Sequence, residues 1–280
     1  MFGIKVCEEY SLYMKDVQNT KGDFLFNIDS VGVDNFIHPI SLKVKEGGCI
    51  NTIGNFSLSV SLEKDIRGIN MSRLPIFVSE LNEDEWSSNK LKYIMIKLRD
   101  KLESKDASIS VEFDYFIKKR APVSGYESVM NYSCKIETSV HKNEVDNKDK
   151  FDTVVTVEVP ITTLCPCSKE ISDYSAHNQR AYVSVSLRYN KLIWIEEIVE
   201  YVESVASCEI YPILKRVDEK YVTEKAYNNP RFVEDIVRLV AEKLFLDDRI
   251  IWFSVKSRHM ESIHRHNAFA KIEYSKQLTI

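Results

Sequence analysis

The sequence contains no apolar run long enough to cross a membrane and no segment near its start that resembles a secretory signal. A spanning helix needs about 20 consecutive apolar residues, and none is present. The first residues read MFGIKVCEEYSLYMKD, with acidic residues early and no apolar core of the kind that a signal peptide carries. We therefore expect a cytoplasmic protein with no membrane partner.

Cysteine is scarce, and neither sign of charge dominates. Six cysteines in 280 residues are too few and too scattered for a disulfide scaffold, which is typical of a reducing compartment. The net charge of -4 provides no general attraction to nucleic acid, so an anionic substrate would need a local basic cluster. The 44% hydrophobic and 29% charged residues indicate an ordinary globular chain of one large domain or two modest ones.

The first half of the chain shows strand and helix periodicity. Apolar residues alternate over residues 109–115 and again around 132–136, which predicts two strands. Between residues 83 and 104 they recur at helical spacing, which predicts a long amphipathic helix. The polar segment 143–152 is expected to be an exposed connection. It suggests a boundary between an N-terminal module, residues 1–148, and a C-terminal module, residues 149–280.

The second half repeats the scheme more clearly. Alternation predicts strands at residues 155–159 and 181–187, and later at 250–257 and 268–274. Two helices are expected between them. The first covers about 194–206, and the second begins with Asn229 as N-cap and Pro230 as first helical residue and ends near Leu244. The order β-β-α-α-β-β, with a looser copy in the first half, predicts an α+β fold of two modules, each an antiparallel sheet with helices on one face.

A long connection between two predicted strands carries sulfur and imidazole. It reads TTLCPCSKEISDYSAHNQR, residues 162–180, and contains Cys165, Cys167 and His177. Thiolate and imidazole are natural ligands of Zn²⁺ and similar ions, although this spacing is not that of a common zinc finger. The competing interpretation is two small buried cysteines and a hydrogen-bonded loop histidine. The residues alone leave the two interpretations about even.

Two further segments carry candidate polar groups. Residues 255–267, VKSRHMESIHRHN, place Glu261 near His264 and His266, a combination suited to acid–base chemistry or to metal binding. The alternative is a solvated basic turn. Residues 211–224, YPILKRVDEKYVTE, offer basic side chains for phosphates and Glu219 as a ligand or base. Charge runs of this kind are more often exposed faces, and Glu234 by itself would be only a favourable partner of a helix dipole.

These segments resemble a known family. TTLCPCSKEISDYSAHNQR, YPILKRVDEKYVTEKAYNNPRFVED and ESIHRHNAFA, with GINMSRLP at residues 68–75, are similar to the signature segments of type IB GTP cyclohydrolases, in matching order over most of the chain. One departure is Asn70, where the family commonly has histidine. The resemblance implies a bimodular tunnelling fold and a homotetramer or other homo-oligomer with active sites near subunit interfaces. It also implies hydrolysis of GTP to 7,8-dihydroneopterin triphosphate and formate, the first step of tetrahydrofolate biosynthesis.

The resemblance also implies a ligand set for a divalent metal, which could be Zn²⁺, Mn²⁺ or Fe²⁺. Cys165 matches the family's metal-binding and catalytic cysteine, His177 its metal-binding histidine, and Glu219 its metal-binding glutamate. Cys167 is the neighbouring cysteine. Such a metal would activate the water that attacks C8 of the guanine ring.

Other positions match the substrate and proton-transfer groups of the family. Glu234 matches the residue that anchors the guanine edge, because a carboxylate accepts two N–H bonds at once. Glu261, His264 and His266 match the catalytic polar cluster that faces the metal. The candidates for the triphosphate are Lys215, Arg216 and Arg180.

Three alternatives remain open at this point. An archaeal-type GTP cyclohydrolase would give 7,8-dihydroneopterin 2',3'-cyclic phosphate instead of the triphosphate. A nitrile reductase of the same fold would use a cysteine nucleophile and NADPH. A non-catalytic protein with structural zinc would have a closed site of four protein ligands.

Overall fold

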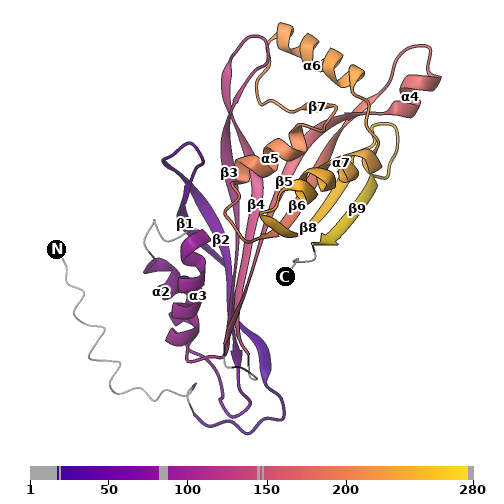
Figure 1. Cartoon of the computed structure of the whole chain (residues 1–280). Helices are drawn as coiled ribbons and strands as arrows, with labels where there is room; N and C mark the ends of the chain where they lie inside the picture. The colour runs from indigo at the N-terminus through magenta and orange to yellow at the C-terminus, as the bar shows by residue number, and fades with distance from the viewer. Residues whose placement is uncertain (1–17, 19, 82–87, 144–145, 147, 277–280) are drawn as a thin grey trace, which may run out of the picture.

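A single antiparallel sheet organises the chain. The computed structural model describes residues 18, 20–81, 88–143, 146 and 148–276. The sheet has nine strands in the order β1-β2-β3-β4-β5-β6-β8-β9, and β7 pairs with β5 outside this path. Figure 1 shows α2 and α3 against one end of the sheet and α5 and α7 against the other. The N-terminal residues that bear on a secretory signal lie outside the described range. The described helices are all too short or too polar to span a bilayer.

Each half of the chain supplies two strand pairs with helices between them. The first half consists of β1 (Ile28–Lys43), β2 (Cys49–Leu62), α2 (Arg73–Ser79), α3 (Ser88–Lys101), β3 (Asp106–Arg120) and β4 (Glu127–Lys142). The second consists of β5 (Asp149–Leu164), α4 (Pro166–Ile171), β6 (Asn178–Tyr189), α5 (Ile195–Glu203), β7 (Cys208–Glu209), α6 (Arg216–Asn228), α7 (Val233–Leu246), β8 (Ile250–His259) and β9 (Ala268–Ser275).

The two faces of the sheet differ in polarity. Cys134 of β4 pairs with Val157 of β5, which pairs with Val185 of β6 and through it with Val255 of β8. These four side chains are buried and lie on the face that the helices cover. Their strand neighbours, such as Ser184, point to the opposite face, as successive residues of a strand must. One apolar face covered by helices therefore runs through both halves of the chain.

Most of the predicted elements are present, and three details are wrong. The sequence predicts only two helices in the second half, with residues 211–224 between them. A further helix, α6, forms there from Arg216 onward. The last long helix begins at Val233 with Phe232 as N-cap, not at Asn229 and Pro230. The predicted connection 143–152 is shorter than expected, because β5 already begins at Asp149. The helix predicted from residue 83 is observed as α3 from Ser88, and residues 82–87 lie outside the described range.

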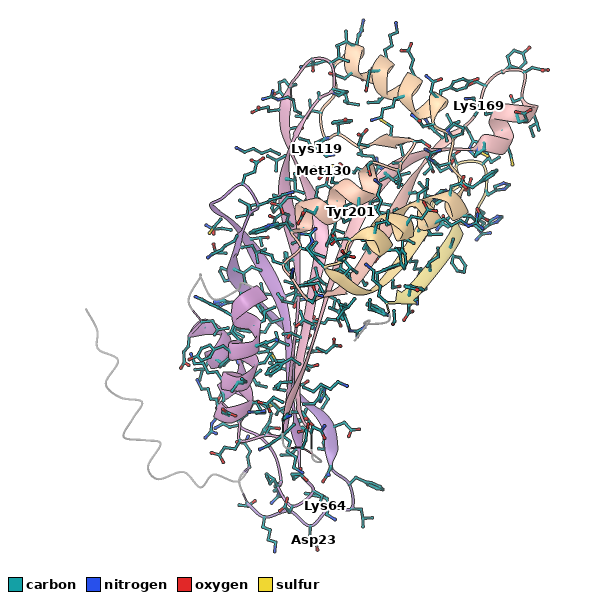
Figure 2. The ribbon with its side chains drawn as sticks, in the orientation of Figure 1. Asp23, Lys64, Lys119, Met130, Lys169 and Tyr201 are labelled. Carbon is teal, nitrogen blue, oxygen red and sulfur yellow. The ribbon has the colours of Figure 1, made fainter. Side chains whose placement is uncertain are left out.

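The two halves are joined by a half-buried polar contact as well as by sheet pairing. Lys119 of β3, labelled in Figure 2, places its Nζ 2.5 Å from Glu203 Oε2 on α5, and the hydroxyl of Tyr132 on β4 donates to Glu203 Oε1 at 2.9 Å. Burial raises the pKa of Glu203, and the charge of Lys119 opposes this shift. The pairing of β4 with β5 and this contact both cross the boundary predicted between residues 148 and 149. The division into two modules stays a prediction.

We expect Glu203→Ala to destabilise the protein strongly. The substitution leaves the half-buried ammonium of Lys119 and the buried hydroxyl of Tyr132 without their acceptor, and a buried polar group left without a partner costs about 1–3 kcal/mol, more for a charged group. The measurement is the free energy of unfolding in urea. The double variant Lys119→Met with Glu203→Leu should recover most of the loss, since no charge is then left unpaired. Equal losses in the single and double variants would contradict this account.

A second contact between the halves holds the start of α6. The carboxylate of Asp218 accepts hydrogen bonds from the backbone N–H groups of Val123, Ser124 and Lys215 and from the Ser124 hydroxyl, at 2.6–2.9 Å. These bonds hold the pKa of Asp218 below its usual range, although desolvation opposes them. The turn between β3 and β4 therefore fixes the first turn of α6.

Candidate active site

Cysteine and histidine lie together where β5 ends and β6 begins. The backbone N–H of Cys165 donates to the carbonyl of His177 at 3.2 Å, directly beyond the last strand pair, Leu164 with Asn178. Cys165 is the N-cap of α4, and its Sγ accepts a contact from the Ser168 N–H at 3.5 Å. Both side chains are half-buried, so a ligand can reach them. Cys167, on α4, is exposed.

The loop after β8 reaches the same place. The Oγ of Ser262 lies 2.9 Å from His177 Nδ1, and the Nε2 of Gln179 lies 3.4 Å from Glu261 Oε1. A hydrogen bond at one ring nitrogen is typical of a metal-binding histidine, because it fixes the ring and leaves the other nitrogen to bind.

Two exposed histidines stand on this loop. The rings of His264 and His266 stack, with centroids 5.0 Å apart and planes 14° apart. The backbone N–H of Met260 donates to the carbonyl of Arg180 at 3.0 Å, which ties the loop to β6. The acid–base candidates Glu261, His264 and His266 thus lie on the loop that contacts His177 through Ser262.

Glu234 approaches the end of β5 from α7. It stands in the first turn of the helix and is exposed. The backbone N–H of Arg231 donates to the carbonyl of Leu164 at 3.1 Å, so α7 begins at the end of β5. The predicted guanine anchor thus lies on the helix that starts beside Cys165.

Two polar residues for which the sequence predicts no role, His259 and Gln179, are buried beside these groups. Burial lowers the pKa of His259 to about 4, while the charge of Glu234 acts in the opposite direction. His259 and Gln179 stand at strand positions that read as ordinary core. Their sequence signal is only that polar residues occupy apolar positions of the alternation.

The other predicted residues lie at a distance from Cys165. The Nζ of Lys169, labelled on α4 in Figure 2, bonds to the carbonyl of Tyr227 at 2.6 Å, so α4 meets the last part of α6. Glu219 stands in the first turn of α6, about two helical turns or roughly 12 Å away from Tyr227. Lys215 and Arg216 lie at that same far end, and the Nζ of Lys215 is 4.9 Å from the Tyr126 ring centroid.

The donor chemistry fits a divalent metal in part. The thiol of Cys165 and the imidazole of His177 belong to residues whose backbones are in contact. A thiolate and an imidazole are suitable ligands for Zn²⁺ or a similar ion. Over the described ranges, however, no three His, Cys, Asp or Glu side chains gather into a group that could hold a metal ion. The structure therefore brings together two of the three predicted ligands, Cys165 and His177, and not Glu219.

A cavity of about 470 Å³ adjoins the candidate site. It lies between the start of β6, β7 and α6, and its lining includes Asn178, Arg180, Glu209 and Tyr211. Its size is within the usual range for ligand pockets, and Arg180 gives it a cation. A larger cavity of about 640 Å³ lies over β1–β6 on the polar face of the sheet and shares no residue with the site.

Comparisons with known proteins agree on one family. The family described as "Type I GTP cyclohydrolase folE2" matches residues 14–270. The protein named GTP cyclohydrolase FolE2 from Magnetococcus marinus is 45% identical over 262 residues, which cover 94% of this chain and 96% of the relative. Its namesake from Methylobacillus flagellatus is 44% identical over 264 residues, with coverage of 94% and 97%.

Solved structures show the same fold at low identity. A hyperthermostable variant of the urate oxidase from Bacillus sp. TB-90 matches with a TM-score of 0.52 and 11% identity, over 89% of this chain and 99% of that chain. The urate oxidase from Bacillus subtilis 168 matches with a TM-score of 0.50 and 8% identity, over 88% and 98%. The likeness concerns the fold alone. The predicted tunnelling fold is confirmed, and its antiparallel strands form one continuous sheet with helices on one face.

Proposed function

The chain belongs to the type I GTP cyclohydrolase folE2 family, and from this premise we propose that it is a metal-dependent enzyme that hydrolyses GTP to 7,8-dihydroneopterin triphosphate and formate. The reaction is the first step of tetrahydrofolate biosynthesis. The observation that carries the proposal, beside the family match, is the backbone contact of Cys165 with His177, whose ring also contacts the loop of Glu261 and His264.

Glu234 holds the substrate in the proposed reaction. Its two carboxylate oxygens accept hydrogen bonds from the ring N–H and the amino group of guanine, which directs the imidazole ring towards the end of β5. Arg180, which lines the adjoining cavity, is the triphosphate candidate nearest to Cys165. Lys215 and Arg216 stay predictions, since they stand at the far end of α6.

Cys165 and His177 would hold the divalent metal, which when bound lowers the pKa of water near it. Glu219 as third ligand stays a prediction, because it lies away from these two donors in the described chain. Zn²⁺, Mn²⁺ and Fe²⁺ all accept this kind of donor set.

The reaction begins with two hydrolytic steps, of which the first opens the imidazole ring and the second releases formate, and each breaks one bond between C8 and a ring nitrogen. The ribose then rearranges and recloses onto the diamine with loss of one water, which gives the dihydropterin. A base must take a proton from the attacking water, and an acid must give one to the departing nitrogen. We assign these transfers to His264 and Glu261, with His266 stacked on His264. Gln179 orients Glu261, because its amide nitrogen lies 3.4 Å from the carboxylate.

We also propose a homotetramer or another homo-oligomer. In the described chain β1 and β9 stand at the two ends of the sheet and pair with one neighbour each. Such edges present unpaired backbone groups that a second copy can complete. A cytoplasmic location, without nucleic acid or membrane partners, fits the composition.

The test is a reaction of metal-stripped protein with GTP, with and without Mn²⁺, Zn²⁺ or Fe²⁺, followed by a formate assay and mass analysis of the pterin. Metal-dependent formate with a triphosphate product is the expected result. Formate with a cyclic phosphate would assign the chain to the archaeal-type reaction instead. Absence of formate with every metal would overturn the proposed function.

A further inference from the structure

A buried imidazole on β8, the strand on which α7 packs, has one nitrogen without a partner among the described residues. His259 is 1% exposed, and its Nδ1 lies 3.4 Å from the hydroxyl of Thr163, which is also buried. Its Nε2 is buried and has no hydrogen-bond partner among the described residues. A buried polar atom without a partner is costly, so it is uncommon in a folded chain unless a ligand or a moving group completes it.

Three contacts place this imidazole near the proposed guanine anchor. His259 pairs with Ala181 at the last register position of β8 with β6, and α7 packs on β8. The backbone N–H of Arg231, just before α7, donates to the carbonyl of Leu164, the residue that follows Thr163. This bond holds the start of α7 close to Thr163. Glu234 follows in the first turn, and its charge acts on the His259 ring. Glu234, whose charge acts on the buried ring, is thus the acid that the proposed function assigns to guanine.

The Thr163 contact is compatible with a tautomer that leaves a donor at Nε2. If the Thr163 hydroxyl donates to Nδ1, the proton of a neutral imidazole is on Nε2, which is then a donor. Burial keeps the pKa of His259 at about 4, so the ring is neutral at pH 7. A neutral donor can hydrogen-bond a carboxylate without neutralising its charge.

We propose that His259 is a positioning residue that acts through Glu234. This role rests on the proposed function. When guanine binds, the exposed Glu234 side chain turns towards the base, and His259 Nε2–H donates to its carboxylate. The carboxylate has lone pairs for this bond as well as for the two N–H bonds of guanine. His259 thereby fixes the orientation in which Glu234 accepts from both the ring N–H and the 2-amino group.

The experiment compares GTP with inosine triphosphate, which lacks the 2-amino group. Equilibrium binding and kcat and KM are measured for the full-length wild type and for His259→Leu, His259→Gln and Thr163→Val. We expect His259→Leu to weaken GTP binding about 10- to 100-fold, as loss of a hydrogen bond to a charged group does, and inosine triphosphate binding less. The ratio of the affinity for GTP to the affinity for inosine triphosphate should therefore decrease. His259→Gln, which keeps a donor of similar reach, should recover part of it, and Thr163→Val should shift it in the same direction as His259→Leu.

Ser257→Ala is the matched control, because Ser257 is wholly buried on the same strand and face and its hydroxyl also lacks a partner among the described residues. It should leave the GTP preference unchanged. Unchanged preference in His259→Leu would overturn the inference. If that variant does not fold, Thr163→Val decides, and an unchanged preference for GTP over inosine triphosphate in Thr163→Val would overturn the inference. A wild type that fails to bind GTP would instead overturn the proposed function, and this inference with it.

Discussion

Cys165→Ala should abolish metal binding and GTP hydrolysis together. Cys165 supplies the thiolate of the proposed donor pair, and alanine leaves His177 as a single neighbouring ligand. Loss of a group that merely orients a ligand costs roughly 10- to 100-fold in metal affinity, so we expect more than about 100-fold for a ligand itself. The fold should survive, because within the described part of the chain the one hydrogen bond to Cys165 Sγ is long, at 3.5 Å from the Ser168 N–H.

Metal content after dialysis, titration with Zn²⁺ or Mn²⁺ and formate release provide the measurements. Cys49→Ala is the control, since Cys49 is an exposed free cysteine in β2. It should change neither metal content nor activity. Cys167→Ala shows whether the exposed neighbour on α4 takes part. Full activity of Cys165→Ala with normal metal content would show that the thiolate is not a ligand, and the proposed site would then be wrong.

The central strands of the sheet could be predicted from the sequence because one of their faces is buried. Alternation at residues 109–115, 155–159 and 181–187 places each apolar side chain on the helix-covered face, and a shift of one residue would expose them all. β3, β5 and β6 are observed at these places. The local pattern and the global fold agree there, so a local reading is sufficient.

α6 could not be predicted in this way, because its stability comes from residues distant in the sequence. Only Asp218 and Ala226 are buried on it, so it carries no apolar stripe. Its first turn is fixed by the backbone of Val123 and Ser124, nearly a hundred residues earlier. The start of α7 was misplaced for a similar reason. Arg231 is held by the Leu164 carbonyl, and the helix begins only after that contact.

The candidate site also has one part that could be predicted from the sequence and one part that could not. Cys165 follows the last residue of β5 and His177 precedes the first residue of β6, so pairing of these two strands brings the residues together. The placement of His259 under α7 depends on how a helix packs on strand ends, which no spacing in the sequence records. Glu219 matches a family motif, but its place in the chain's own structure follows from the anchoring of α6.

Glu234→Gln should lower kcat/KM for GTP strongly with little change in stability. A glutamine offers one acceptor and places an NH₂ group against a guanine donor, where the carboxylate offers two acceptors. Loss of one partner in a buried charged hydrogen-bond pair costs about 2–5 kcal/mol, which corresponds to roughly 30- to 5,000-fold. Glu242→Gln is the matched control, because Glu242 is an exposed carboxylate on the same helix, roughly 12 Å further along.

The competing account of Glu234 is that it only complements the helix dipole in the first turn of α7. That role contributes about 0.3–1 kcal/mol to stability and nothing to substrate recognition. The two accounts therefore predict opposite results. A guanine anchor loses kcat/KM and GTP binding while the free energy of unfolding changes little, and a dipole partner loses a small amount of stability while kcat/KM is retained. Urea unfolding and steady-state kinetics on Glu234→Gln and Glu242→Gln separate them, and retained kcat/KM would remove Glu234 from the site.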